Sequence, residues 1–223
     1  MMSNVFSTFD PTTSTSMSLN WLSSVLVLML IPSMYWLIPS RYNMITKMLY
    51  MKLYSELSEV LGSKNKNSSI LFISLFMFIM TINMVGLLPY IFTSSSHLVF
   101  TLSLALPVWF SGILLGWINN TQHMFAHMVP KGTPAVLLPF MVCIETISIL
   151  IRPVALSVRL MANMVAGHLF LCLLGGFVAS CSYNMFPNMM MLELFMMAYE
   201  TAVALIQAYV FSMLSALYIK EAT

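Results

Sequence analysis

Apolar runs long enough to cross a bilayer alternate with short polar segments along most of this chain. A spanning helix needs about 20 apolar residues, and the pattern predicts five membrane-embedded helices, over 19–38, 69–92, 98–119, 135–180 and 189–219. Residues 1–18 form a polar tail, and 135–180 is long enough for two passes or for one strongly tilted helix. We therefore expect an all-α integral membrane protein with a single membrane domain (1–223), its last two helices long, tilted and antiparallel.

A different pattern occupies residues 41–66, where charged side chains interrupt apolar ones. Leu49, Leu53 and Leu57 recur at helical spacing, with Lys52 and Glu56 between them. This pattern predicts an amphipathic helix that lies on the membrane surface. The alternative is a solvated connecting loop.

Composition supports a membrane protein and excludes several function classes. Charged residues make up 7% of the chain, against about 25% in soluble domains, and the mean hydropathy is +0.90. A net charge of +2 leaves no basic surface for a nucleic acid. No P-loop motif is present, so no directly bound nucleotide is expected. His123 and His127 stand four apart without an evident third ligand, so we expect no metal and no other cofactor.

The distribution of Lys and Arg predicts how the chain is oriented. With one pass per apolar run, every Lys and Arg outside 135–180 falls on one side of the membrane: Arg41, Lys47, Lys52, Lys64, Lys66, Lys131 and Lys220. Positive charge gathers on the inner side, which places the N-terminus outside and the C-terminus inside after five passes. Two passes within 135–180 would put Lys220 on the opposite side, so a single long helix is favoured.

Ionisable side chains within the spans are the candidate functional residues, because Arg, Lys or Asp at the bilayer centre costs about 2.5–3.5 kcal/mol on insertion scales. In the 135–180 helix, one stripe carries a residue of this kind every seventh position: Glu145, Arg152 and Arg159. The last helix carries its own stripe at the same spacing: Glu193, Glu200 and Gln207. Both helices therefore present a polar line.

Antiparallel pairing across the turn at 181–188 brings two pairs of these residues to nearly the same level. Arg159 comes near Gln207, and His168 comes near Glu200, although His168 lies off the Arg159 stripe and needs a tilted crossing to reach its partner. Small residues flank Arg159 and let another helix approach closely. We therefore expect Arg159 to meet an anion on a neighbouring helix.

Each candidate residue also has a purely structural explanation. Arg159 would be held in an ion pair with Glu145 or Glu200, and His168 would share a core hydrogen bond with Glu200. Gln207 would only bridge helices, and Glu145 would be a carboxylate at a helix end. The spacing leaves these alternatives open.

Two runs of residues carry a family resemblance. Residues 145–168 (ETISILIRPVALSVRLMANMVAGH) and 200–211 (ETAVALIQAYVF) closely resemble subunit a of F-type ATP synthases, in its mitochondrially encoded form. Residues 83–90 and 130–134 are similar to the same family. The excess of Met and the lack of a transit peptide resemble an invertebrate mitochondrial gene product.

The resemblance implies a proton-conducting stator subunit of the membrane sector, without catalytic activity alone. It places Arg159 opposite the carboxylates of the rotating ring of c subunits, where it blocks a proton short-circuit. It assigns His168 and Glu200 to the half-channel open to the intermembrane space, with Asn163 and Gln207 beside the arginine. It assigns Glu145 to the matrix half-channel.

The same resemblance implies where the chain works and with what. The expected location is the mitochondrial inner membrane, with the N-terminus towards the intermembrane space and the C-terminus towards the matrix. The expected partners are the c-ring, peripheral-stalk and other membrane subunits, membrane lipids and the transported protons. The competing functions are a secondary proton-coupled transporter and a purely structural membrane subunit.

Overall fold

Helices make up nearly all of the computed structural model, which describes residues 5–14, 17–31, 38–62, 65–129 and 137–222. No strand occurs among these residues. Four of the helices are long and apolar enough to cross a membrane; they are α3 (Ser69–Gly86), α4 (Leu98–Asn119), α6 (Leu138–Ser180) and α7 (Phe186–Ala222). The all-α membrane fold class is therefore confirmed.

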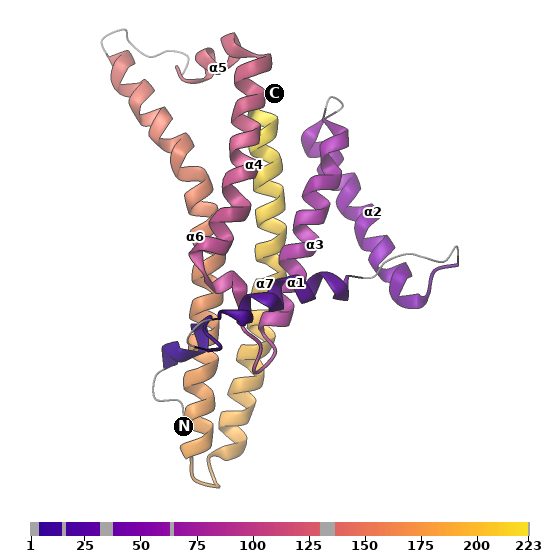
Figure 1. Cartoon of the computed structure of the whole chain (residues 1–223), viewed down its shortest axis with the longest axis vertical. Helices are drawn as coiled ribbons and strands as arrows, with labels where there is room; N and C mark the ends of the chain where they lie inside the picture. The colour runs from indigo at the N-terminus through magenta and orange to yellow at the C-terminus, as the bar shows by residue number, and fades with distance from the viewer. Residues whose placement is uncertain (1–4, 15–16, 32–37, 63–64, 130–136, 223) are drawn as a thin grey trace.

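The two longest helices form an antiparallel hairpin (Figure 1). α6 is one helix of 43 residues that continues through Pro153, so this segment does not split into two passes. α7 begins at Phe186, earlier than the expected residue 189. Pro187 suits the first turn of α7 because the backbone N–H that it lacks would have no partner there.

Close approach of α7 to its neighbours forms the centre of the bundle. α7 packs against α3, α4 and α6. Ala204, Ala208 and Ala216 are at most 1% exposed, so small residues on α7 allow the neighbouring helices to come close. Phe72 of α3 and Phe211 of α7 fill the apolar core.

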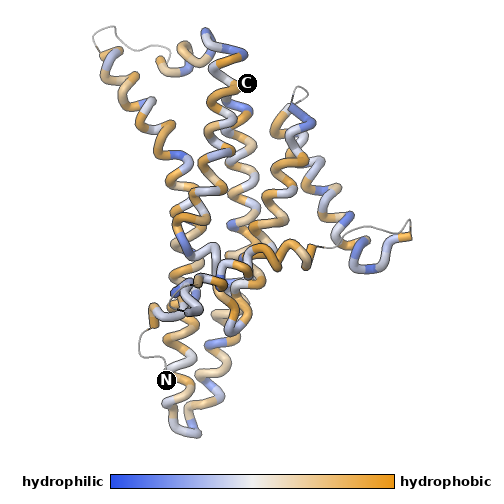
Figure 2. The backbone as a smooth tube through the Cα atoms, viewed as in Figure 1, coloured by the Kyte–Doolittle hydropathy of each residue, from blue (hydrophilic) through white to orange (hydrophobic). Residues whose placement is uncertain are grey.

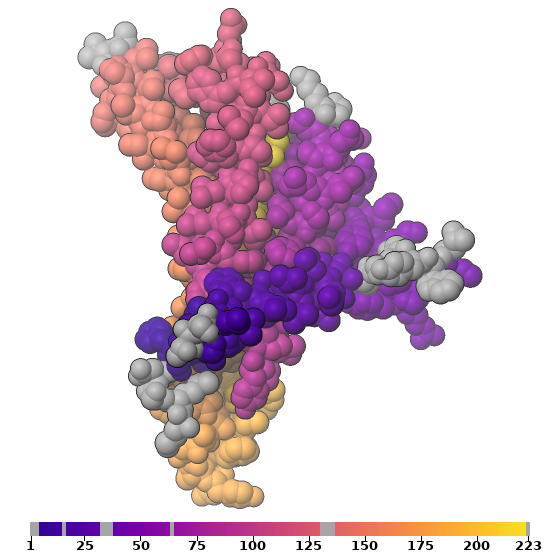
Figure 3. All heavy atoms as spheres, in the orientation of Figure 1, coloured from indigo at the N-terminus to yellow at the C-terminus, as the bar shows by residue number. Residues whose placement is uncertain are grey.

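The first apolar segment folds into a short element rather than a long helix. It comprises η2 (Leu19–Trp21), α1 (Leu22–Leu26) and η3 (Val27–Leu30), which together are shorter than a membrane span. This segment crosses the bundle at a steep angle to the long helices, in front of them in the view shown (Figures 1 and 3). Residues 32–37 of the expected helix 19–38 lie outside the described residues.

A helix, α2 (Arg41–Leu61), occupies the segment for which a surface helix was expected, so the alternative of a connecting loop is wrong. It ends at residue 61 rather than 66 because Gly62, with φ of 73°, adopts the left-handed conformation that terminates helices. Leu53, Leu57 and Leu61 bury one face of α2, which packs against α3 and α7. Its hydrophilic residues alternate with apolar ones along the outside (Figure 2).

The connections between the spans explain where α3 and α4 end. α3 stops at Gly86, before the expected residue 92, because Pro89 has no N–H to continue the helix. Short η5 (Ser94–Ser96) follows, and α4 covers the expected range 98–119. The expected polar connector begins with α5 (Thr121–His127). The motif at 130–134, which includes Lys131, lies outside the described residues.

Candidate functional site

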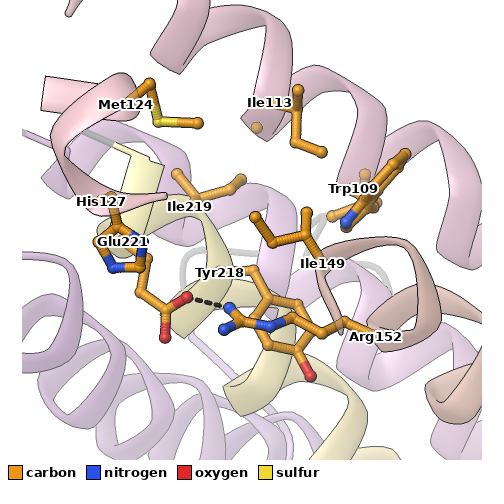
Figure 4. Close-up of a pocket in the computed structure, with 11 residues that line it drawn as sticks. Trp109, Ile113, Met124, His127, Ile149, Arg152, Tyr218, Ile219 and Glu221 are labelled. Carbon is orange, nitrogen blue, oxygen red and sulfur yellow. Dashed lines mark hydrogen bonds and ion pairs between the residues drawn. The ribbon is translucent and has the colours of Figure 1, made fainter. Parts of the chain in front are cut away.

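Arg152 on α6 is neutralised by the chain itself. Its guanidinium forms an ion pair with Glu221 near the end of α7 and lies over the ring of Tyr218, 5.4 Å from the centroid (Figure 4). A small cavity of about 50 Å³, into which His127 also points, adjoins this pair. Arg152 therefore has a counter-ion within its own chain.

Arg159, two turns further along α6, has opposite surroundings. Its side chain is exposed, and it makes neither an ion pair nor a side-chain hydrogen bond with any described residue. Neither Glu145 nor Glu200 pairs with it, so the ion-pair alternative is wrong. Arg159 is a cation that the described chain leaves without a counter-ion.

The surface around Arg159 is small, apolar and uncovered. Ala155, Ala162 and Ala166 are exposed at helical spacings from the arginine. Exposed apolar side chains extend the same face of α6 in both directions: Ile144, Ile147, Ile151, Val154, Val158, Phe170 and Leu173. Another helix can therefore approach this face closely.

Glu200 on α7 is buried against α6. The residue is 6% exposed, and neither carboxyl oxygen has a hydrogen-bond partner among the described residues. A Cβ placed on Gly167 of α6 would lie 2.9 Å from Cδ of Glu200, so the glycine leaves the space that the carboxyl group occupies. With Asn163, these residues line a cavity of about 200 Å³, called here the Glu200 cavity.

His168 opens into a different and larger space. It lines a cavity of about 690 Å³, called here the His168 cavity, together with Asp10, Glu193 and the 87–93 connection. A backbone hydrogen bond joins the imidazole to Gly86 on α3. Nε2 of the ring is buried and has no hydrogen-bond partner within the described chain.

The His168 and Glu200 cavities are separate but share one lining residue. Leu87 lines both cavities, and Gly167, beside His168 in the chain, touches the Glu200 carboxyl group. No ion pair joins His168 to Glu200 among the described residues, and Nε2 and both carboxyl oxygens lack partners, so these atoms are not the two ends of a core hydrogen bond.

The remaining expected site residues take less central places. Asn163 lies one turn from Arg159 and lines the Glu200 cavity. Gln207 is half-buried on α7, two turns beyond Glu200. Glu145 is half-buried near the start of α6 and forms no ion pair within the described chain. The structure thus brings Glu200 and Asn163 into one cavity but does not join Glu145 to them.

Three further polar residues of this region had no specific role assigned from the sequence. Glu193 and Asp10 line the His168 cavity, and Asn83 on α3 is fully buried with both side-chain polar atoms unpaired. The seven-residue spacing of Glu193 from Glu200 is a signal in the sequence, whereas Asp10 has none because its position depends on how the tail folds back. In the described part of the chain, no group of three or more His, Cys, Asp or Glu could hold a metal ion.

Comparison with known proteins gives one consistent result. The family model described as ATP synthase A chain matches residues 15–220. A protein of Drosophila melanogaster named ATP synthase subunit a is 56% identical over 222 residues, which are 99% of each chain. Its namesakes from Anopheles gambiae and Aedes aegypti are 55% and 54% identical, again over 99% of both chains.

Proposed function

This chain belongs to the ATP synthase A chain family, and from that premise we propose how its own residues carry protons. It is the proton-conducting stator subunit of the membrane sector and has no catalytic activity on its own. It is a multi-pass protein of the mitochondrial inner membrane that works with other subunits of the complex. The residue roles and specific partners that follow are proposals.

Protons enter through the cavities between α6 and α7. The His168 cavity is wide enough to hold water, since each water needs only about 30 Å³. The imidazole of His168 takes a proton there and passes it towards the carboxyl group of Glu200. Asn163, in the Glu200 cavity, lies between that carboxyl group and the Arg159 level of α6. This path is the half-channel from the intermembrane space.

The proton then neutralises a carboxyl group on a helix of the rotating c-ring. A neutral acid can move into lipid because the large cost of desolvating its charge is gone. After nearly a full turn, the acid reaches the second half-channel, which includes Glu145, and releases its proton to the matrix. Each proton driven by the membrane potential supplies about 2.3 kcal/mol per 100 mV, so several protons are needed for each ATP.

Arg159 separates the two half-channels. The observation that carries the proposal is its uncompensated guanidinium within a small, exposed, apolar face. A cation there attracts a ring carboxylate and therefore favours loss of the proton from the ring carboxylic acid. Protons cannot pass straight between the channels, because they meet a fixed positive charge first.

Charge distribution supports the proposed orientation. The N-terminal segment lies towards the α6–α7 turn, and the C-terminus lies at the opposite end of the bundle (Figure 1). We assign the turn to the intermembrane space and the C-terminal end, with its Lys-rich neighbours, to the matrix. The exposed face of α6 contacts the c-ring, and the remaining apolar surfaces contact lipids, the peripheral stalk and other membrane subunits.

Replacement of Arg159 tests this function. In complexes reconstituted into vesicles, Arg159→Ala abolishes ATP-driven proton pumping while the complex still assembles. Arg152→Gln is the matched control, because it removes an arginine of the same helix that already has a counter-ion in this chain. We expect this variant to keep pumping. Normal pumping by Arg159→Ala would refute the stator mechanism and favour the purely structural subunit.

A further inference from the structure

One acidic residue of the membrane region, Glu193, has no role in the proton path described so far. Its carboxyl group leans towards α6, where a Cβ on Gly175 would lie 3.9 Å from Oε1. Glu193 also lines the His168 cavity. An ionisable side chain within a membrane span marks an ion or proton pathway by default.

One face of α6 connects the level of Glu193 with His168. Residues 168, 172 and 175 lie at helical spacings of four and three, so they share one face. Cys172 and His168 both line the cavity into which Glu193 points. The seven residues from Gly175 to His168 correspond to about 10 Å along the helix axis. That distance exceeds a direct hydrogen bond, and the 690 Å³ cavity has room for bridging waters.

The tail adds a second acid, Asp10, to the lining of the same cavity. Asp10 accepts hydrogen bonds from the backbone N–H and the hydroxyl of Thr12, at 3.1 and 2.7 Å. These bonds lower the pKa of Asp10 below its ordinary value of 3.8, so the carboxylate is ionised at neutral pH. Its negative charge attracts cations, protons included, to the cavity.

The ionisable residues that line the cavity within the described chain are acids, a phenol, a thiol and an imidazole. They are Asp10, Tyr90, His168, Cys172 and Glu193. No Lys or Arg of the described chain is among them, so no fixed cation repels an incoming proton.

We propose that Glu193 is a further proton-relay residue, which collects protons from water near Asp10 and delivers them through water in the cavity to the imidazole of His168. The proton that Glu193 gives to the imidazole leaves a carboxylate on Glu193, and a hydronium ion from the water near Asp10 restores the acid. This inference rests on the proposed function, since it extends the same half-channel by one station.

The test uses whole complexes in vesicles, with ATP synthesis driven by an imposed proton gradient. Glu193→Gln removes the proton exchange but keeps the size of the side chain. We expect it to slow synthesis about tenfold, relative to the native complex, when the pH on the intermembrane-space side (the outer pH) is alkaline. This loss is less than the roughly 100-fold typical of a positioned acid–base group, because water still reaches the cavity beside His168. The rate returns to native at acidic outer pH, where hydronium is abundant. Glu193→Asp retains most of the alkaline rate.

Controls separate this inference from the proposed function. Glu59→Gln, an exposed acid on α2, behaves as native at every pH. Asp10→Asn shows a weaker form of the alkaline defect. A native rate for Glu193→Gln at all pH values, or an equal loss at all of them, overturns the relay role, the latter outcome meaning a structural role. Arg159→Ala, run in parallel, keeps the proposed function testable whichever result Glu193→Gln gives.

Discussion

Single residues of α6 differ in what surrounds them more than in what they are. Arg152 and Arg159 are seven positions apart, yet within the described residues only the first has a carboxylate of its own chain as an ion-pair partner. A buried or membrane-embedded charge is tolerated when it is paired. The unpaired arginine is therefore the one whose counter-ion must come from elsewhere.

Gly167 makes the residue-scale prediction, because it holds the space into which the Glu200 carboxyl group fits. In Gly167→Ala, the new Cβ would lie 2.9 Å from Cδ of Glu200, closer than carbon atoms pack. The carboxyl group must shift from its present position, so we expect proton pumping to fall severalfold while assembly is kept. Pumping by reconstituted complexes measures the effect.

The matched control lies on the same helix. A Cβ on Gly176 would meet nothing within 4 Å, so Gly176→Ala pumps as the native complex does. Equal pumping by both variants would show that the position of the Glu200 carboxyl group does not matter to conduction.

The sequence allowed these residues to be identified because charged residues are rare within the apolar runs. It did not predict features that depend on how the helices and the N-terminal tail pack together. Arg159 and Glu200 stand out because ionisable residues within apolar runs are few. Spacing could not show that His168 and Glu200 open into separate cavities, because this depends on how α6 is rotated against α7. It could not place Asp10 in the cavity that His168 lines either, because the tail has no periodic pattern from which its packing can be predicted.

At the scale of helices, apolar length predicted the long elements well and the broken ones poorly. α6 is a single helix because one continuous apolar run with no turn signal extends from its start to the 181–185 turn. The segment from Leu19 to Leu30 was expected to be part of a span, but it folds into two 3₁₀ turns and a short α-helix across the bundle. Apolar composition cannot distinguish a helix that crosses a membrane from one that lies over other helices.

The orientation of the α6–α7 hairpin makes the prediction at this scale. Tyr183 in its turn is 93% exposed. In a chain whose three cysteines are replaced by serine, we expect Tyr183→Cys to react with a membrane-impermeant thiol reagent only from the intermembrane-space side. Lys220→Cys, at the other end of α7, serves as the control and reacts only from the matrix side. The reverse pattern would invert the proposed half-channels.

The molecule as a whole leaves a large apolar surface uncovered. Its described core gathers around α2, α3 and α7, while much of the apolar surface of α6 is uncovered. Lipid can cover that face, but lipid offers no counter-ion to Arg159. The combination of an apolar surface, small residues and one bare cation therefore indicates a protein partner that carries acids.

A density map of the assembled complex, resolving the side chains around Arg159, tests the central claim most directly. We expect the guanidinium to face a carboxyl-bearing helix of the c-ring, which packs against the face formed by Ala155, Ala162 and Ala166. A carboxylate of this same chain permanently paired with Arg159, or only lipid opposite it, would contradict the mechanism.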